Sequence, residues 1–424
     1  MRVYQFRHAD VGAEYATSSP ARTTSPPARS GAGAASLSGP MRITRRNPDE
    51  THEVAGPATV ADVLGQLGIN PETVLVIADG ELVTKGHLLA DDAEVEIRSV
   101  ISGGARALRC HACGADAIIE VARHRAAYCA EHFVDHVRNQ VRSAIDRHGM
   151  LSYDDRILVA VSGGKDSLAL WDVLLDMGYH VDGLYLGLGI GGYSSRSEEV
   201  VRRFAEARDA HLHTVDLAAE YGYDIPDATR LRNRTACGVC GLSKRYVFNR
   251  VALDGGYDAM ATGHNLDDEA ATLLGNVLHW KESMLARQSP ALPAEGGLAK
   301  KVKPLYRLGE REMAAYCVIR GLDYVVEECP LVAGNTVLRY KEALNGLEEH
   351  APGTKAAFLF GYLDRVRDAR FGDADEGGGE GMRACTSCGM PTATPREYQS
   401  DEEVRCAFCR AQGRILQVVE RRSA

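Results

Sequence analysis

Hydrophobic and polar positions follow one another between residues 151 and 370 in a way that predicts alternating strands and helices. Residues 157–161, ILVAV, form a short apolar run bounded by polar residues, which is typical of a strand buried on both faces of a parallel sheet. Further strands are predicted at 181–188, 211–217, 257–263 and 323–326. Helical apolar faces lie between them, as at 195–209 and at Leu168, Trp171, Leu174 and Leu175. This alternation predicts a doubly wound α/β sheet.

Residues 41–104 have a different pattern, which predicts a small α+β unit. The predicted order is strands at 41–46 and 51–56, a helix at 58–69, a hairpin turning at Asp79-Gly80 and a last strand at 93–100. The segment ends in Gly103-Gly104. The order and the terminal glycines together resemble the β-grasp sulfur carriers related to ubiquitin. The alternative is a generic α+β domain followed by a Gly-Gly hinge.

Composition changes along the chain and predicts its division into segments. Residues 15–40 are rich in Ser, Ala, Pro and Gly and cannot bury enough apolar area to fold. A biological start at Met41, or a transit peptide, is an alternative explanation of this tail. The predicted segments are a disordered tail (1–40), a β-grasp domain (41–104), a zinc finger with a connecting helix (105–150), a catalytic α/β domain (151–370), an acidic linker (371–381) and a zinc ribbon (382–424).

Charge and hydropathy exclude a membrane-spanning protein and limit how the chain could bind nucleic acid. The 424 residues are 45% hydrophobic and 25% charged, which is ordinary for a globular protein, and no apolar run approaches the length of a membrane span. No secretory signal precedes the folded segments, so we expect a cytoplasmic protein. The formal net charge is −9, so any binding of nucleic acid must use a local basic surface.

The eleven cysteines are arranged for metal binding or redox chemistry rather than for disulfides. One group has the spacing C-x2-C-x15-C-x2-H, and another has the spacing C-x2-C-x17-C-x2-C. Each supplies four soft ligands in two close pairs, the arrangement that tetrahedral zinc requires. The predicted zinc ligands are Cys110, Cys113, Cys129 and His132, and then Cys385, Cys388, Cys406 and Cys409.

A glycine-rich loop lies between the first predicted strand of the α/β domain and the helix after it. Backbone N–H groups in such a loop, together with the helix N-terminus, favour an anion. The spacing is not that of a Walker loop. It resembles the SGGxDS loop of the PP-loop ATP pyrophosphatases, which bind ATP and adenylate an oxygen of the substrate. The predicted nucleotide-binding residues are Ser162, Gly163, Gly164, Lys165, Asp166 and Ser167.

Cys237 and Cys240 form a further CxxC pair within residues 228–250, a stretch without acidic residues. Its cations are Arg230, Arg232, Arg234, Lys244, Arg245 and Arg250. Such a field predicts lowered thiol pKa values. Three interpretations remain: a redox pair, half of a zinc site, or ligands of an iron–sulfur cluster. The two zinc groups leave Cys237, Cys240, Cys317 and Cys329, and Cys317 lies in a predicted helix, where we expect a small buried apolar residue.

A second polar motif, from Thr262 to Glu269, follows the strand predicted at 257–263. There a parallel sheet presents its carboxyl ends to ligand. The candidate residues are Gly263, His264, Asp267 and Asp268. A histidine and two carboxylates could orient metal-bound phosphates or move a proton. The alternative is a capped helix start.

These motifs together, with KPLY at 303–306 and EECP at 327–330, resemble the two-zinc-finger tRNA 2-thiouridine synthetases, which include enzymes for uridine 54 and for uridine 34. The resemblance implies a [4Fe–4S] cluster held by Cys237, Cys240 and Cys329, with one iron open for sulfur. It also implies catalytic roles for Lys244 and Asp268, with Asp267 as the alternative to Asp268. The family is fed by a β-grasp carrier with a C-terminal thiocarboxylate, and in this chain such a carrier is fused in front.

The resemblance predicts an ATP-dependent tRNA thiolase that uses Mg²⁺, the cluster and two Zn²⁺ ions. The uracil C2 oxygen would be adenylated and then replaced by sulfur, while the basic stretches 228–250 and 300–307 would hold tRNA phosphates. One alternative is a thiolase with a persulfide on Cys237 or Cys240 and no cluster. Another is a ubiquitin-like modifier with an RNA-binding scaffold. The sequence leaves open whether position 54 or 34 is modified.

The predicted partners are tRNA, a sulfur carrier with its E1-like activating enzyme, and a second copy of the chain in a homodimer. In this chain Gly104 is bonded to Ala105, so it has no free carboxylate to activate. Either a protease cuts after Gly104 and frees the carrier, or the domain only docks and sulfur comes from elsewhere. We expect the cut.

Overall fold

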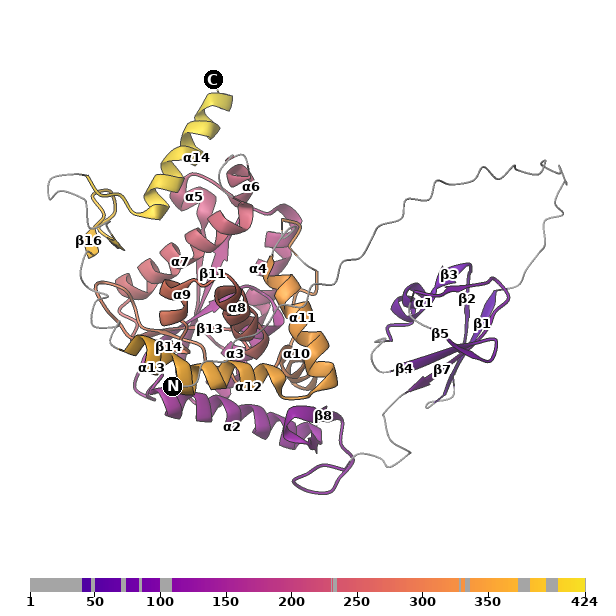
Figure 1. Cartoon of the computed structure of the whole chain (residues 1–424). Coiled ribbons are helices and arrows are strands. Elements are labelled where there is room, and N and C mark those ends of the chain that lie inside the picture. Colours follow the sequence, from indigo (N-terminus) through magenta and orange to yellow (C-terminus); the bar gives the residue numbers. More distant parts are fainter. Residues whose placement is uncertain are drawn as a thin grey trace, which may run out of the picture. The chain divides into compact units, whose positions relative to one another are not determined.

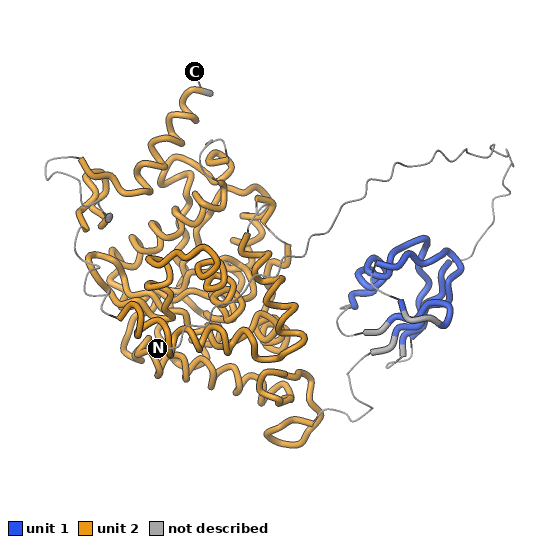
Figure 2. Tube along the Cα trace, viewed as in Figure 1, with its two compact units in different colours: residues 1–106 blue, residues 107–424 orange. Residues whose placement is uncertain are grey.

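The computed structural model describes residues 40–46, 50–69, 74–83, 86–99, 109–229, 231, 235–327, 329–331, 336–372, 382–393 and 403–423. The chain divides into two compact units, residues 1–106 and residues 107–424 (Figure 2). The predicted tail up to residue 39, the linker residues 373–381 and Gly103-Gly104 lie outside the described residues. Within the described part, no helix has the length and hydropathy needed to cross a bilayer.

The first unit is built on a five-stranded mixed sheet in the order β2-β1-β7-β4-β5, in which β1 and β7 are parallel (Figure 1). Its strands are β1 (Met41–Arg46), β2 (Glu50–Val54), β4 (Val74–Ala78), β5 (Glu81–Val83) and β7 (Glu94–Ser99), with a short pair β3 (Ala58–Thr59) and β6 (Leu88–Leu89). Helix α1 (Val60–Gln66) follows β3. The predicted order of strands, helix and hairpin is confirmed.

Two local features explain this order. Thr59 and Asp62 form a reciprocal capping box that starts α1, and the buried face of the helix belongs to the same core as Ile43 and Ile97 of the sheet. At the hairpin between β4 and β5, Asp79 and Gly80 both have positive φ, +51° and +84°. That conformation fits a two-residue turn between twisted antiparallel strands and is the reason for the Asp-Gly sequence.

The second unit contains a six-stranded sheet in the order β12-β11-β10-β13-β15-β14, parallel except for β14 (Figure 1). Its strands are β10 (Arg156–Val161), β11 (His180–Gly187), β12 (Leu212–Asp216), β13 (Ala259–Thr262), β14 (Ala291–Leu292) and β15 (Lys301–Val302). Two hairpins lie outside this sheet: β8 (Ile119–Val121) with β9 (Ala126–Tyr128), and β16 (Met382–Ala384) with β17 (Pro391–Ala393).

Helices cover both faces of this sheet, so the doubly wound prediction is confirmed. Ile157 and Val159 of β10 belong to one buried core and Leu158 to another, as expected for a strand buried on both sides. The first core includes side chains of α2 (Ala130–His148), α3 (Lys165–Asp176), α4 (Gly191–Ala207), α10 (Glu310–Ile319) and α12 (Thr354–Tyr362). The second includes side chains of α5 (Leu217–Tyr221), α6 (Ile225–Ala228), α7 (Ala236–Asp254) and α14 (Ala407–Ser423). Helices α8 (Leu266–Leu278) and α9 (Glu282–Ala286) also contribute to the first core. The remaining helices are α11 (Thr336–His350) and α13 (Asp368–Phe371), with a 3-10 turn at Ala122–His124 and a π-helical turn at Leu363–Arg367.

The strand predicted at 323–326 is wrong. The described residues 322–327 have no regular secondary structure, although the segment is rich in strand-forming residues. Val325 N–H donates to the Gly163 carbonyl at 2.9 Å, and Val326 is 79% exposed. The segment is therefore tied to the loop after β10 rather than added to the sheet.

Candidate active site

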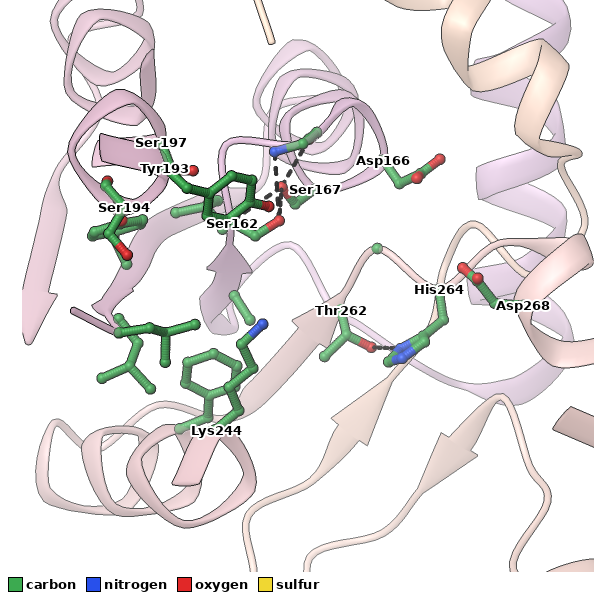
Figure 3. Close-up of a pocket in the computed structure, with 18 residues that line it drawn as sticks. Ser162, Asp166, Ser167, Tyr193, Ser194, Ser197, Lys244, Thr262, His264 and Asp268 are labelled. Carbon is green, nitrogen blue, oxygen red and sulfur yellow. Dashed lines mark hydrogen bonds between the residues drawn. The ribbon is translucent and has the colours of Figure 1, made fainter. Parts of the chain in front are cut away.

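A cavity of about 370 Å³ lies at the carboxyl ends of β10, β11 and β13, where a doubly wound sheet binds ligand (Figure 3). Polar side chains from four separate segments converge on it, and an apolar wall is formed by side chains of β11 and α7. The polar lining residues are Ser162, Asp166, Ser167, Tyr193, Ser194, Ser197, Lys244, Thr262, His264 and Asp268. The predicted loop, the second motif and Lys244 thus meet in one cavity.

The loop between β10 and α3 is held by its own serines. Ser162 N–H donates to Ser167 Oγ at 3.1 Å, and the Ser167 hydroxyl donates to the Gly164 carbonyl at 2.9 Å. Gly164 is the residue before α3 begins, so the loop curls over the helix N-terminus. This is the geometry that favours a phosphate group.

Two glycines allow the backbone segments around the cavity to approach one another. Gly163 has φ +78°, and a Cβ there would lie 2.9 Å from the Ser197 carbonyl oxygen. A Cβ on Gly263 would lie 2.8–2.9 Å from backbone atoms of Asp166 and Ser167. Any other residue at either position would push the loop away from α4 or from the end of β13.

Asp166 is fixed by Asn265, which is not among the predicted site residues. Its Oδ1 accepts from Asn265 Nδ2 at 3.0 Å, and Asn265 also caps α8. Burial raises the pKa of Asp166; Asp268 and Glu310 add to the effect, whereas Lys165 and Asn265 oppose it. Asp166 and Asp268 thus bring two carboxylates to the same cavity, where a cation would offset their charge.

Lys165, predicted to contact phosphates, pairs with carboxylates rather than lining the cavity. Its Nζ lies 2.7 Å from Glu310 Oε1 and 3.2 Å from Asp166 Oδ2. Burial lowers the pKa of Lys165, but the charges of Asp166 and Glu310 outweigh that effect and raise it. Its role as a phosphate ligand stays a prediction.

The second motif places its two aspartates differently. Asp268 lines the cavity, whereas Asp267 is buried, pairs with Lys355 and accepts the Glu310 backbone N–H at 2.8 Å. His264 also faces the cavity, and its Nδ1 lies 2.8 Å from Thr262 Oγ1 (Figure 3). Of the two aspartates, Asp268 is thus the one positioned to meet a substrate.

Helix α7 joins the cavity to the third group of cysteines. Lys244 and Cys240 are four residues apart and so lie on the same face of the helix, and Lys244 reaches the cavity. Cys237 Sγ lies 3.5 Å from the carbonyl oxygen of Leu331, two residues after Cys329. Cys240 and Cys329 pack against the same core, and we name Cys237, Cys240 and Cys329 the cysteine triad.

Tyr193 lies between the cavity and the triad. Burial raises its pKa, and the charges of Cys329 and Cys240 add to this effect. Tyr193 also lines a second hollow of about 560 Å³, whose wall includes Pro330 and Leu331. The triad and the cavity are thus neighbouring regions that share one side chain.

The prediction of lowered thiol pKa values in this stretch is wrong for Cys240. Burial raises its pKa, and the charge of Lys244 opposes burial without outweighing it. Arg230, Arg232 and Arg234 lie outside the described residues, and Arg245 is exposed. Counting charges along the sequence missed the desolvation of the thiol.

The two predicted zinc groups are each assembled around one point, and we name them the cysteine tetrads. In each, all four donor atoms lie within 4.8 Å of one another. Cys113 Sγ and Cys129 Sγ are 4.0 Å apart, and Cys388 Sγ and Cys406 Sγ are 3.8 Å apart. Bonds of about 2.3 Å around a tetrahedral zinc ion give sulfur–sulfur separations of about 3.8 Å. The donor sets therefore fit zinc.

Backbone N–H groups also favour thiolates in the tetrads. Burial raises the pKa of the Cys110 thiol, but hydrogen bonds from the backbone N–H groups of Cys129 and Cys113 outweigh burial and lower this pKa to about 6. In the same way, N–H groups of Cys406 and Cys388 lower the pKa of Cys385 to about 6.

The cysteine triad has a different geometry. Within the described residues its three thiols do not form a group whose donor atoms all lie within 4.8 Å. Thiolates that bind three different irons of one cluster lie farther apart than thiolates that share one zinc ion. Three soft donors near one another, but not around a single point, fit a cluster better than a single ion.

A further group, Asp182, His211 and His213, brings its donor atoms within 4.8 Å at the opposite ends of the strands. The Tyr257 hydroxyl donates to Asp182 at 2.5 Å and lies 2.6 Å from His213 Nε2. Two of the three donors thus have hydrogen-bond partners already, and we assign no ion to this group.

The basic stretch 300–307 is largely engaged inside the unit. Lys303 Nζ lies 2.8 Å from Glu269 Oε2, and Lys300 Nζ donates to the Gly149 carbonyl at 3.0 Å. Burial lowers the pKa of Lys301, and the charge of Arg245 adds to this. Contact of this stretch with tRNA stays a prediction.

Comparisons with known families cover both units. The ThiS family matches residues 38–104, the N-terminal LIM domain of 2-thiouridine synthetase TtuA matches 109–134, and the PP-loop domain matches 134–330. These matches confirm the predicted folds of the β-grasp unit and of the α/β sheet.

Full-length relatives are also similar. The tRNA-5-methyluridine(54) 2-sulfurtransferase of Thermus thermophilus is 48% identical over 301 residues, which are 71% of this chain and 90% of that protein. The protein of the same name from Pyrococcus horikoshii is 42% identical over 72% of this chain and 94% of its own length. A solved structure, the U34-tRNA thiolase NcsA from Methanococcus maripaludis with its [4Fe-4S] cluster, has a TM-score of 0.55 at 25% identity, covering 60% of this chain and 87% of that one.

Proposed function

The chain belongs to the tRNA 2-thiouridine synthetases of the TtuA type, ATP-binding sulfurtransferases that thiolate tRNA, and from this premise we propose which of its residues carry out the reaction. The supporting observation is the single cavity in which the Ser162–Ser167 loop, Asp268 and Lys244 meet, and whose lining residue Tyr193 also borders the hollow at Pro330 and Leu331, next to Cys329 of the triad. Activation of a base oxygen and delivery of sulfur need sites next to each other, and this arrangement provides them.

The loop residues bind the ATP phosphates through backbone N–H groups and the N-terminus of α3. The apolar wall of the cavity, with Leu186 and Phe248, receives the adenine base. Asp166 and Asp268 are the candidate ligands of Mg²⁺, because carboxylates suit this ion and a cation offsets their charge. The uracil C2 oxygen then attacks the α-phosphorus, the bond to the β-phosphate oxygen breaks, and pyrophosphate leaves.

Lys244 and Asp268 face the reacting base from opposite walls of the cavity. Lys244 stabilises negative charge at the activated carbonyl, and Asp268 positions the base or accepts its proton. A sulfur nucleophile attacks C2, the C2–O bond breaks, and AMP leaves. Cys237, Cys240 and Cys329 would hold a [4Fe–4S] cluster, which supplies an open iron for sulfur when bound.

The tetrads would hold two Zn²⁺ ions and stabilise the parts of the fold that flank the cavity. The second tetrad is attached to α7: Phe408 stacks on Tyr246 with ring centroids 3.8 Å apart, and Arg250 donates to the Cys388 carbonyl at 3.2 Å. Zinc at this tetrad therefore supports the helix that carries Lys244 and two cysteines of the triad.

We propose uridine 54 rather than uridine 34 as the target. Relatives from Thermus, Pyrococcus and Thermotoga that are named for position 54 are 48%, 42% and 37% identical to this chain. The U34 enzyme of known structure is 25% identical. Two tRNA transcripts test this, one with cytidine at position 54 and one with cytidine at position 34. Loss of thiolation with the first alone supports the proposal, and loss with the second alone overturns it.

The ThiS-like unit is proposed as the sulfur donor after a cut that follows Gly104. An E1-like enzyme would then adenylate the new carboxylate before its conversion to a thiocarboxylate. Intact-mass analysis of the native protein tests this. A fragment ending at Gly104, with the mass of a thiocarboxylate, supports it, whereas full thiolation by an uncut chain carrying Gly104→Ala overturns it. The homodimer and the cytoplasmic location stay predictions.

The decisive experiment measures tRNA-dependent pyrophosphate release and nucleoside mass spectra with anaerobically reconstituted full-length protein. Thiolation that requires both ATP and bound iron supports the proposed sequence of steps. Full activity in iron-free protein would instead favour a persulfide on Cys237 or Cys240.

A further inference from the structure

The first turn of helix α8 contains three consecutive acidic residues, and each pairs with a lysine from a different later segment. Asp267 pairs with Lys355, Asp268 with Lys341, and Glu269 with Lys303. Of the three carboxylates, Asp268 is the one that lines the cavity. Lys341 thus differs from the other two lysines because its partner, Asp268, lines the cavity in which we propose that the reaction takes place.

Lys341 fixes the Asp268 carboxylate in place. Its Nζ lies 2.6 Å from Asp268 Oδ1, and its side chain is 17% exposed. The other oxygen of Asp268, Oδ2, accepts the Asn265 backbone N–H at 3.1 Å. With one oxygen held by the ammonium and the other by the cap of α8, the carboxylate has a defined orientation at the cavity wall.

The same ammonium is connected to the nucleotide loop. Lys341 Nζ lies 3.2 Å from Glu310 Oε2, and the other oxygen of Glu310 lies 2.7 Å from Lys165 Nζ. Lys165 in turn contacts Asp166. A continuous chain of ion pairs therefore runs from Asp268 through Lys341, Glu310 and Lys165 to Asp166, the two ends of which line the same cavity.

The ammonium stays charged in this position. Burial lowers the pKa of Lys341, but the carboxylates of Asp268 and Glu310 outweigh burial and raise it well above its ordinary value. A neutral side chain of similar size would leave two partly buried carboxylates without their shared cation.

Attachment of α11 to the body of the unit does not depend on this ion pair. Leu344 is buried with Ala270 and Ala271 of α8, and Val337 and Tyr340 pack against the same group. The aromatic ring of Tyr340 lies over Gly275. Because the interface is apolar, loss of the Lys341 charge should leave the helix in place.

We propose that Lys341 is a positioning residue for adenylation, which orients Asp268 and, through Glu310 and Lys165, the nucleotide loop. This inference rests on the proposed function of the cavity. Lys341 is not among the residues that line the cavity, so in this proposal it acts through the carboxylates and not on ATP or the base directly. Its removal should therefore lower turnover more than it weakens the binding of ATP.

The test measures tRNA-dependent pyrophosphate release, ATP affinity and thermal unfolding in the reconstituted full-length protein. Lys341→Met should lower kcat about tenfold or more and change the Kd for ATP much less, and Lys341→Arg should recover most of the loss. The loss in the double variant Asp268→Asn/Lys341→Met should be smaller than the product of the two single losses, because part of the lysine's effect passes through that aspartate. Lys355→Met is the matched control: it removes the neighbouring ion pair of α8, and its folded fraction should retain kcat.

The outcomes separate this inference from the proposed function. An active wild type together with Lys341→Met at wild-type kcat, or losses that multiply in the double variant, would overturn the inference alone. Failure of both Lys341→Met and Lys341→Gln to fold, while Lys355→Met folds, would show a structural role and overturn it too. A wild type without tRNA-dependent pyrophosphate release would overturn the proposed function and this inference with it.

Discussion

The cysteine tetrads and the cysteine triad both contain CxxC motifs, but the motif adopts two different backbone conformations. In the tetrads, the CxxC pairs at Cys110 and Cys385 form turns. Each turn is closed by a glycine, Gly114 or Gly389, with φ near +73° and an N–H bond of 2.8 Å back to the first cysteine carbonyl. Cys237 and Cys240 instead lie on helix α7.

This difference decides what the thiols can bind. A tight turn wraps backbone N–H groups and both sulfurs around one point, which suits a single tetrahedral ion. A helix directs two thiols outward from one face and leaves room for a third from another segment. The residue after the second cysteine is glycine in these three pairs, although Arg410 follows the fourth pair, Cys406 and Cys409, so among the three the distinction depends on the φ of the glycine and not on its identity.

The largest expected effect comes from breaking the triad. Cys237→Ser should abolish iron binding and lower thiolation by at least about 10³-fold, because sulfur delivery is lost, while the melting temperature stays near that of the wild type. Iron content, thiolation and thermal unfolding check this. Cys317→Ala is the matched control: this thiol is buried and donates to the Lys165 carbonyl, and the change should leave iron bound. Wild-type iron content in Cys237→Ser would contradict the assignment.

Lys244→Met separates the triad from the cavity. We expect pyrophosphate release to fall about 10²- to 10³-fold while iron content is unchanged, because Lys244 lines the cavity but supplies no sulfur ligand. Lys281→Met, on an exposed residue, is the control. Loss of iron in Lys244→Met would show that the lysine supports the triad instead.

Loss of the contact that attaches the second tetrad to α7 should lower the free energy of unfolding. Phe408→Ala removes the stacking contact with Tyr246 and leaves a hole beside the second tetrad, so we expect a loss of about 3–5 kcal/mol in the free energy of unfolding. Denaturant titration measures it. Zinc content should be retained in the folded fraction; a variant as stable as the wild type would show that the tetrad does not brace α7.

The smallest effect concerns the first tetrad, whose hairpin is anchored by a buried group. Arg123 and His136 both contact Glu312. Burial raises the pKa of Glu312, but the contacts with His136 and Arg123 outweigh burial and lower it. A lowered carboxyl pKa stabilises the fold above the unfolded value of about 4.3, and this stabilisation is lost as the pH falls through the folded value.

Glu312→Gln should therefore cost about 2 kcal/mol at pH 7, and the difference from the wild type should shrink below about pH 4. Stability curves at several pH values check the sign. A difference that grows in acid would contradict the lowered pKa.

The parts of the site that are built from residues close together in the sequence could be predicted from the spacing of those residues. The Ser162–Ser167 loop and both tetrads depend on residues close in sequence, and the structure assembles them as expected. Asn265 lay inside a recognised motif but was not singled out, because its contact with Asp166 depends on the neighbouring strand.

Other parts depend on tertiary contacts that no local pattern encodes. Lys341 and Tyr193 belong to helices without a motif and become part of the site through packing. The pKa direction of Cys240 was predicted from nearby cations, although burial decides it. The segment at 323–326 is held by a bond to the Gly163 carbonyl, which strand propensity does not reveal.

The common face of α7 fixes the helical phase between the Cys240 thiol and the Lys244 ammonium. Four residues advance a helix by about one turn, so Lys244 stands almost directly below Cys240. One residue inserted between them would rotate Lys244 by about 100° out of the cavity without moving either thiol. In the proposed reaction the length of α7 between these two residues is therefore constrained, because it sets where the Lys244 ammonium lies relative to the Cys240 thiol.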